Sequence, residues 1–456
     1  MEVIMAKNLT KAEKRKMREN TNEFVDIAHI SKHYFKELKN WINDMMDPRH
    51  QSYITYTQPD LIFQLLLKNL CSVESMNQME EKFNEEICIH NLKTISGNKN
   101  LIEIPHYDTV NNYLEKLSPE CLDELRGKMV RKLIRSKTFD SARIAGGHWR
   151  VILDGTGLFH FRERHCEHCL KRVRTNEDGT KRIDYYHHVL EAKLVLHDKI
   201  IISLGTEFIE NEHEDVEKQD CELNAAKRLL ARIKKQYPRL KICVLGDALY
   251  AAESIMKICR TNEWTYILNN KGERQKSITE DYDYIKSANP DNYFDVKYKS
   301  EKGISYYVNH VEEVTGGKTE IFNVYEYEYE YIQDEKSHRF VWITNIDLKK
   351  NNLEEMVAAG RSRWKIENEG FNNQKNGLYR IEHLNSKHST AMKNHYLLVQ
   401  IADILMQLYL ASKKLVEETK EAIKNTPSRL LEFFRKHAVT GEDVIYIHRH
   451  TTVHLE

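Results

Sequence analysis

The pattern of hydrophobic and polar positions changes about a third of the way along the chain. Up to about residue 140, apolar residues recur at helical spacing, and the segment 61–67 is a strongly apolar helix core. The opening of this region is basic, with Lys or Arg at six positions between 7 and 18. After residue 148 the apolar runs become short and β-branched, which predicts strands. We therefore expect a helical N-terminal region followed by an α/β domain.

The order of the later runs predicts a mixed sheet. Strands are expected at 151–153, 189–196 and 200–204, the last two joined by a turn at Asp198-Lys199. A helix over 221–236, a strand over 242–245, another helix and a strand over 266–268 follow. Residues 325–331 alternate Tyr and Glu, which predicts a strand with tyrosines on one face.

These patterns predict five regions. A buried strand over 340–343 and a long helix from about 353 past 375 follow the Tyr-rich part. The expected regions are a helical region over 1–140, a first part of an α/β core over 148–275, a β-rich insertion over 276–337, the rest of the core over 338–410, and a helical tail over 411–456.

Two aspartates follow apolar strands. Asp154 comes after 151–153, in an expected Asp-Gly turn that ends the strand, and Asp247 follows 242–245. Taken singly, the first is typical of a turn and the second of a helix cap. Taken together, two carboxylates on strand ends of one sheet can converge on a hard cation, and a third acid would complete a divalent metal site.

The helix over 361–375 offers two candidates for the third acid. At about 100° per residue, Glu367 and Glu369 point about 200° apart, so only one can face a given site. Glu367 shares a face with Arg363, and Glu369 shares one with Lys365. We choose Glu367 and keep Glu369 in reserve. The alternative is an ordinary solvated Arg–Glu pair, which this spacing also produces.

Composition narrows the class of protein. The 456 residues carry 69 Lys plus Arg and 69 Asp plus Glu, so the net charge of zero excludes a uniformly basic coat, and any polyanion must meet a local patch. With 41% hydrophobic and 30% charged residues the chain is not of the disordered class. No apolar run reaches the roughly 20 residues of a membrane helix, and the opening lacks the apolar core of a secretion signal. Eight cysteines in this length are ordinary for a reducing cytosol.

A Cys-x2-Cys pair raises the question of zinc. Cys166 and Cys169 form half a site, and no second pair follows at finger spacing. His187 or His188 could complete the set across the hairpin. The sequence favours a Cys- and His-containing loop over a structural zinc ion at Cys166/Cys169.

Three motifs, each with one of the candidate acids, occur in this order: Leu-Asp-Gly-Thr-Gly at 153–157, Asp-Ala-Leu-Tyr-Ala at 247–251 and Arg-Trp-Lys-Ile-Glu at 363–367. Because of these motifs, residues 148–410 resemble bacterial insertion-sequence transposases of the Asp-Asp-Glu (DDE) type. The segments 185–192 and 340–345 are also similar to that family. The similarity is to the branch with a β-rich insertion and a Tyr-x2-Arg-x3-Glu-x6-Lys signature. Gly360 occupies the Tyr position, and Lys375 follows Glu367 by eight residues instead of seven.

The resemblance implies a ribonuclease-H-like mixed α/β core with a β-rich insertion, flanked by helical N- and C-terminal regions. It implies that the core over 148–275 and 338–410 is catalytic and that the helical region over 1–140 binds the DNA ends. It implies that Asp154, Asp247 and Glu367 are catalytic residues and ligands of two Mg²⁺ ions, for which Mn²⁺ can substitute. Arg363 and Lys375 would contact DNA phosphates.

The function that follows is DNA transposition. The resemblance implies cleavage at the terminal inverted repeats of an element and strand transfer into target DNA, by a homodimer in the bacterial cytoplasm that associates with the nucleoid when bound to DNA. Two alternatives stay open: a metal-dependent nuclease or decayed DNA-binding relative, and a non-enzymatic helical scaffold. The nuclease would nick without joining, and the scaffold would hold the three acids far apart.

Overall fold

The computed structural model describes residues 22–449, apart from 164, 273, 300, 316–317, 332–335 and 413–424. The chain folds into two compact units. The helical unit comprises 1–137 and 372–456, and the sheet unit comprises 138–371. The predicted region 338–410 therefore divides between them at residue 371, while the limits of the five regions stay a prediction. The basic opening at 7–18 lies outside the described residues.

The helical unit is built around one apolar helix. Helix α13 is buried along nearly its whole length and packs against α2, α4, α7 and α8. Helix α4 begins at a capping box in which Thr57 and Asp60 satisfy each other's backbone N–H groups. The described helices are α2 (Glu23–Tyr34), α3 (Leu38–Asn43), η1 (Gln51–Tyr53), α4 (Gln58–Leu70), α5 (Met76–Phe83), α6 (Glu86–Ser96), α7 (Tyr107–Lys116), α8 (Pro119–Arg135), η6 (Asn373–Gly377), α13 (Ser389–Ser412), α15 (Thr426–Lys436) and α16 (Gly441–Arg449).

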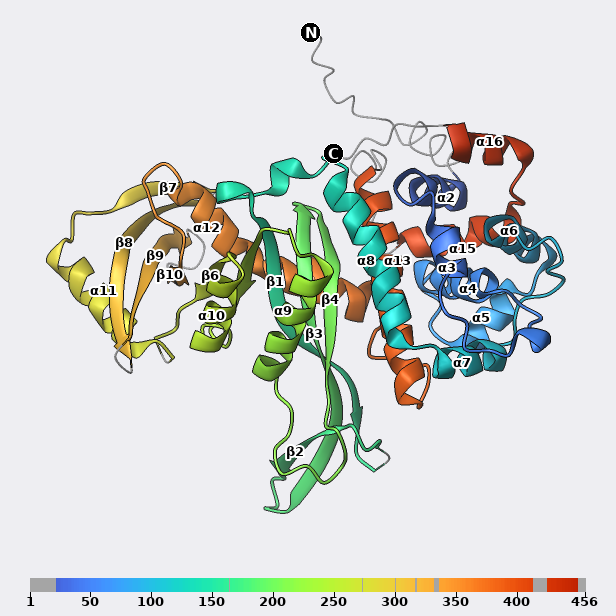
Figure 1. The fold of residues 1–456 in the computed structure, drawn as a ribbon, viewed down its shortest axis with the longest axis horizontal. Helices are drawn as coiled ribbons and strands as arrows, with labels where there is room; N and C mark the ends of the chain where they lie inside the picture. Colours follow the sequence, from blue (N-terminus) through green and yellow to red (C-terminus); the bar gives the residue numbers. More distant parts are fainter. Residues whose placement is uncertain are drawn as a thin grey trace, which may run out of the picture. The chain divides into compact units, whose positions relative to one another are not determined.

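The sheet unit holds one ten-stranded sheet, whose order can be followed in Figure 1. The order is β2-β3-β1-β5-β6-β10-β9-β8-β7, with β4 paired to β3. Strands β4, β3 and β1 are antiparallel neighbours, and β5 and β6 run parallel to β1. This arrangement confirms the expected ribonuclease-H-like mixed sheet. The strands are β1 (Trp149–Phe161), β2 (Leu170–Thr175), β3 (Lys181–His197), β4 (Ile200–Ile209), β5 (Ile242–Gly246), β6 (Thr265–Asn269), β7 (Phe294–Tyr298), β8 (Glu301–Thr315), β9 (Lys318–Tyr331) and β10 (Lys336–Thr344).

Strand β1 corrects one sequence expectation. It does not end in a turn at Asp154 but continues to Phe161, with Gly155 paired to Leu190 of β3. Gly155 serves here as a strand residue because other side chains come close to it: a Cβ would lie 2.5 Å from Glu222 Oε2 and 2.6 Å from His188 Nε2. Asp154 therefore projects from the middle of a strand.

Four further helices of the sheet unit lie between the strands or after the last strand, and two short turns precede β1. These are α9 (Glu222–Gln236), α10 (Glu253–Thr261), α11 (Lys276–Ala288) and α12 (Leu353–Arg361), with short turns η2 (Asp140–Ala142) and η3 (Ala145–Gly147). The β-rich segment thus begins with a helix, α11, that its Tyr-rich composition did not reveal. Its strands β7, β8 and β9 continue the main sheet through β10.

The alternation at 325–331 is confirmed, and at the start of the run the Glu face is covered as well as the Tyr face. Tyr325 and Tyr327 are buried, and Tyr325 stacks on Trp342 with ring centroids 4.9 Å apart. On the other face Glu326 is also buried, paired with Lys286 of α11 and with Arg339 at 2.7 Å. The insertion is therefore a sheet layer between helices.

The expected long helix from 353 past 375 is not a regular α-helix. After α12 it tightens into a 3₁₀ turn, η4 (Ser362–Trp364), and then widens into a π-helix, η5 (Ile366–Phe371), with η6 following. Ile366 and Phe371 are both buried in the core of the sheet unit. Because these two residues lie five apart, π winding is what brings both to the sheet.

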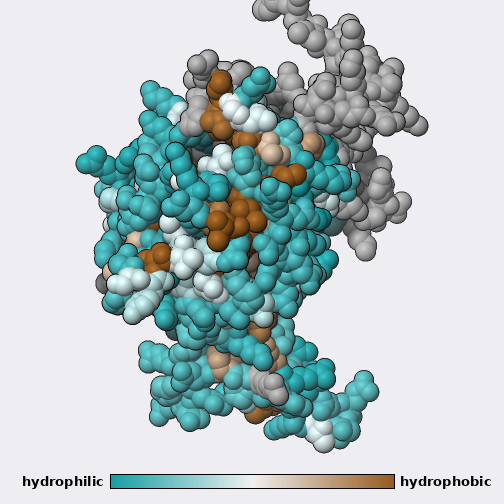
Figure 2. All heavy atoms as spheres, turned by 90° about the vertical axis from the view of Figure 1, so that its right-hand side faces the viewer, coloured by the Kyte–Doolittle hydropathy of each residue, from teal (hydrophilic) through white to brown (hydrophobic). Residues whose placement is uncertain are grey.

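On the face seen in Figure 2, hydrophobic residues form small separate patches within a hydrophilic surface. Within the described part of the chain, no helix combines the length and the hydropathy needed to cross a bilayer.

Candidate active site

Asp154 lies on β1, and Asp247 directly follows the parallel neighbour strand β5. Val151 pairs with Val244 and Ile152 with Leu245, so the same register, continued by two residues, sets Asp154 of β1 beside Asp247 after β5. The pKa of Asp154 is raised to about 7, first by burial and then by the neighbouring carboxylates of Glu222 and Asp247. The sheet thus gathers negative charge at this point.

Glu222 is a fourth carboxylate that the sequence did not reveal. It opens α9, accepts a hydrogen bond from the Tyr250 hydroxyl, and lies 3.7 Å from His188 Nε2. Burial raises its pKa, and Asp247 raises it further. A glutamate in the first turn of a helix is an ordinary feature, so only the fold singles it out.

The structure separates the two glutamates of η5. Lys365 Nζ lies 3.4 Å from Glu369 and 3.6 Å from Asp198 in the β3–β4 turn. The cross-strand partner of Asp154 is Glu191, six residues before the end of β3 at His197, or about 20 Å along the strand. Glu369 therefore pairs with Lys365, which also contacts the β3–β4 turn, and this turn is at the end of β3 distant from Asp154.

Glu367 is exposed and does not share the side of η5 on which Glu369 lies. With about 80° per residue in a π-helix, Glu367 and Glu369 still lie on opposite sides. Helix η5 packs against β1 and β4. The ligand oxygens of Asp154, Asp247 and Glu367 do not all lie within 4.8 Å of one another. Among the described residues, one set of three or more His, Cys, Asp or Glu side chains is that compact, and it does not include these acids.

The two predicted DNA-binding cations have partners of their own. Arg363 lowers the pKa of Asp154 by its charge and lies over the Trp364 ring, 4.7 Å from the centroid. Lys375 belongs to the helical unit and pairs with Glu382 at 2.8 Å. Arg363 is thus placed beside the acids.

Gly360 explains a departure from the signature. A Cβ at this position would lie 2.5 Å from the buried Trp342 ring. A tyrosine could not occupy the position without displacing that ring. The indole of Trp342 fills the space that a side chain at position 360 would need.

The group that does meet the 4.8 Å criterion is Cys166, Cys169 and His187. The structure thereby chooses His187 over His188. The Cys169 thiol and the His187 ring are both within hydrogen-bond distance of Cys166, and both lower the pKa of the Cys166 thiol.

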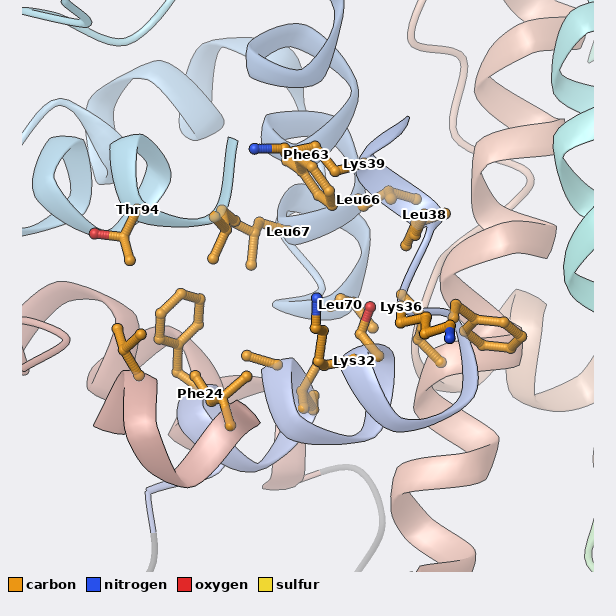
Figure 3. A pocket seen from close by; sticks show the side chains of 18 of the residues that line it. Phe24, Lys32, Lys36, Leu38, Lys39, Phe63, Leu66, Leu67, Leu70 and Thr94 are labelled. Atoms are coloured by element: carbon orange, nitrogen blue, oxygen red, sulfur yellow. The ribbon is translucent and has the colours of Figure 1, made fainter. Parts of the chain in front are cut away.

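The helical unit contains a cavity of another kind. It has a volume of about 350 Å³ and is lined mainly by apolar side chains, among them Phe24, Leu66 and Leu70, together with Lys32 and Lys36 (Figure 3). No carboxylate is among its described lining residues. It therefore cannot hold the acids that a metal-dependent site requires.

A comparison with protein families identifies the domain in which the acid cluster lies. Residues 145–403, more than half of the chain, match the family described as Transposase DDE domain. The chain belongs to this family. The transposase and DDE expectations are thus confirmed, whereas the insertion-sequence branch and its Tyr-Arg-Glu-Lys signature stay a prediction.

Among solved structures, the chain is similar to a piggyBac transposase in a cryo-EM synaptic complex with hairpin DNA. The identity is 10%, the TM-score is 0.42, and the match covers 95% of this chain and 85% of that one. No curated protein matches the chain.

Proposed function

We propose that this DDE transposase-domain protein cuts DNA at the ends of a mobile element and transfers the freed strand into target DNA. The observation that supports this most directly is the placement of Asp154 on β1 and of Asp247 directly after β5, the parallel neighbour of β1, within the matched region. Arg363 lies within electrostatic reach of the pair. Catalysis is assigned to Asp154, Asp247 and Glu367.

The oxygen donors of Asp154 and Asp247 suit a divalent cation, and Glu367 has to move toward them to complete the site. These oxygens are hard ligands of the kind that Mg²⁺ and Mn²⁺ prefer. Like charges gathered at Asp154, Asp247 and Glu222 repel one another, and a cation would offset that repulsion. When bound, two such ions supply an activated oxygen nucleophile and charge stabilisation on the leaving oxygen.

The protein's own groups have the remaining tasks. Asp154 is fixed by the sheet and by a bond from the Gly155 N–H at 3.0 Å, so its carboxylate keeps one orientation. Arg363 balances part of the charge and can bind a DNA phosphate. Tyr250 holds Glu222 at the edge of the cluster. Glu367 lies on the exposed side of η5, where DNA can reach it.

The test is a cleavage and joining assay with Mg²⁺. The DNA is a plasmid carrying this gene with its native flanks, and the proteins are the wild type, Asp154→Asn, Asp247→Asn and Glu367→Gln, with Glu369→Gln as the matched control. We expect at least about a hundredfold loss of cleavage in the first three variants, since even residues behind a metal ligand cost 10- to 100-fold. DNA binding, measured by gel shift, is expected to be retained.

Other outcomes would change the assignment. If Glu369→Gln loses cleavage and Glu367→Gln does not, the third acid is Glu369. Nicking without joined products would identify a nuclease. If the wild type cuts with neither Mg²⁺ nor Mn²⁺, the transposition proposal is wrong for this chain.

A further inference from the structure

Cys166, Cys169 and His187 form a compact cluster outside the acid site. Cys166 Sγ and Cys169 Sγ are 3.6 Å apart, and each sulfur is 3.3 Å from His187 Nε2. A tetrahedral zinc ion with Zn–S of about 2.3 Å and Zn–N of about 2.05 Å requires edges of about 3.8 Å and about 3.5 Å. The three observed edges agree with these values to within about 0.2 Å.

The backbone around the two cysteines is fixed by Asn211, a buried residue that follows β4. Asn211 Nδ2 donates to the carbonyl of Cys169 at 2.9 Å, and the Asn211 N–H donates to the carbonyl of His168 at 3.1 Å. The Cys169 N–H closes the turn onto the Cys166 carbonyl at 3.2 Å. The two sulfurs are thus held in place by bonds that do not involve the sulfurs themselves.

His187 is held equally firmly from β3. It is buried, and its ring meets Phe159 and Phe161 of β1 edge to face, with centroids 6.2 Å and 6.1 Å away. Cys169 is also buried, whereas Cys166 is partly exposed. A soft, largely dry donor set of two sulfurs and one imidazole suits Zn²⁺ and differs from the oxygen donors of the acid site.

Neither a disulfide nor a redox-active cysteine pair fits this geometry as well as zinc does. A disulfide needs sulfurs about 2.05 Å apart, far less than the observed separation. A redox-active Cys-x2-Cys pair is typically at a helix N-terminus, whereas this pair lies in a turn before β2. Among the described residues no fourth His, Cys, Asp or Glu joins the group. The fourth corner is left to solvent beside Cys166, or to His165, whose Nδ1 is buried without a hydrogen-bond partner.

We propose that Cys166, Cys169 and His187 bind one Zn²⁺ ion that fastens the loop before β2 to β3. In Figure 1, β2 and the start of β3 extend beyond the rest of the sheet, and residues 181–184 of β3 pair with β2 alone, as a two-stranded ribbon. Apart from its pairing with β3, β2 is mostly exposed, and a ribbon of two strands has little stability of its own. Zinc at its base would fix where the ribbon starts.

The first test measures zinc in the purified full-length protein after equimolar ZnCl₂ and removal of loosely held metal. We expect about one zinc per chain in the wild type, and loss of it in Cys166→Ser, Cys169→Ser and His187→Gln. Cys121→Ser and His188→Gln are the matched controls and are expected to keep it. Cobalt in place of zinc is expected to give the thiolate charge-transfer and tetrahedral ligand-field bands. Circular dichroism identifies a variant that fails to fold.

A second test addresses the fastening role. Trypsin can cut the ribbon at Lys171, Arg172 and Arg174, and we expect a chelator to speed this cleavage at least tenfold in the wild type. In Cys166→Ser the chelator is expected to have no effect. A folded wild type that takes up no zinc, or that contains a Cys166–Cys169 disulfide by mass spectrometry, would overturn the site. Zinc uptake with no effect of chelator on cleavage would overturn the fastening role. Neither result depends on DNA cleavage.

Discussion

Lys68 makes a sharp prediction about stability. It lies in α4 and is 3% exposed, with its ammonium group donating to the Glu74 carbonyl at 3.1 Å. Burial lowers the pKa of Lys68 from 10.5 to about 8, and the charge of Glu74 offsets this only in part. A shift of this size corresponds to about 3 kcal/mol, since each pKa unit is worth about 1.4 kcal/mol. At neutral pH, the folded protein therefore holds a buried, charged ammonium group at Lys68, and burial of this charge opposes folding.

The direction with pH follows from the proton count. Below pH 8 the lysine is charged in both states, so the full cost of burying the charge opposes folding. Between pH 8 and 10.5 the folded state releases the proton while the unfolded state keeps it, so the free energy of unfolding rises. Lys68→Met removes the cost of about 3 kcal/mol and forfeits a hydrogen bond worth about 1 kcal/mol. The net expectation is a gain of about 2 kcal/mol at pH 7.

Urea unfolding followed by helical ellipticity measures this change, because the described elements of the helical unit are helices. We expect Lys68→Met to unfold at higher urea at pH 7 and the difference from wild type to shrink or reverse by pH 10. Lys436→Met, at an exposed lysine in α15, is the control and is expected to change stability by less than about 0.5 kcal/mol. A destabilised Lys68→Met at pH 7, together with no difference in pH dependence from wild type, would refute the reasoning.

Two further predictions concern the same forces elsewhere. Burial lowers the pKa of His395 from 6.5 to about 3, and the charge of Lys68 adds a smaller effect in the same direction. As the pH falls, His395 is therefore protonated in the unfolded state before it is protonated in the folded state. Stability is expected to fall by up to about 4 to 5 kcal/mol between pH 6.5 and 3, and His395→Leu to remove that part of the fall in urea midpoints; equal acid sensitivity in the variant would contradict this. Gly360→Ala is expected to destabilise the sheet unit by about 1 to 3 kcal/mol, because its Cβ would meet Trp342 at 2.5 Å. Gly441→Ala, with open space around it, is the control, and thermal unfolding of both variants decides the matter.

The sequence revealed the parts of the fold that local patterns control. Apolar runs and turn residues located β1, β3, β4, β5 and β6, and two aspartates after such runs proved to lie on neighbouring strands. Periodicity could not show that β1 runs on through Gly155, because that depends on the approach of Glu222 from a distant helix. The π winding of η5 was equally out of reach, since burial of Ile366 and Phe371 against the sheet determines it.

The candidate site residues also divide into those that local sequence reveals and those that only tertiary packing reveals. Residue types at short spacing identified Asp154, Asp247 and the Cys166-x2-Cys169 pair from the chain alone. The choice of His187 over His188 depends on which face of β3 meets the loop, and a pair of neighbouring histidines gives no sign of it. Glu222 comes to the acids through tertiary packing only.

The helical unit is assembled from two segments separated by the entire sheet unit, and this has a consequence during synthesis. Helices α4, α7 and α8 leave the ribosome long before α13, the helix against which they pack. At 5 to 20 residues per second, the delay is on the order of 10 to 50 s. Throughout that interval the nascent chain presents uncovered apolar helix faces, so a premature stop within the sheet unit would yield an aggregation-prone product in place of a separate helical domain.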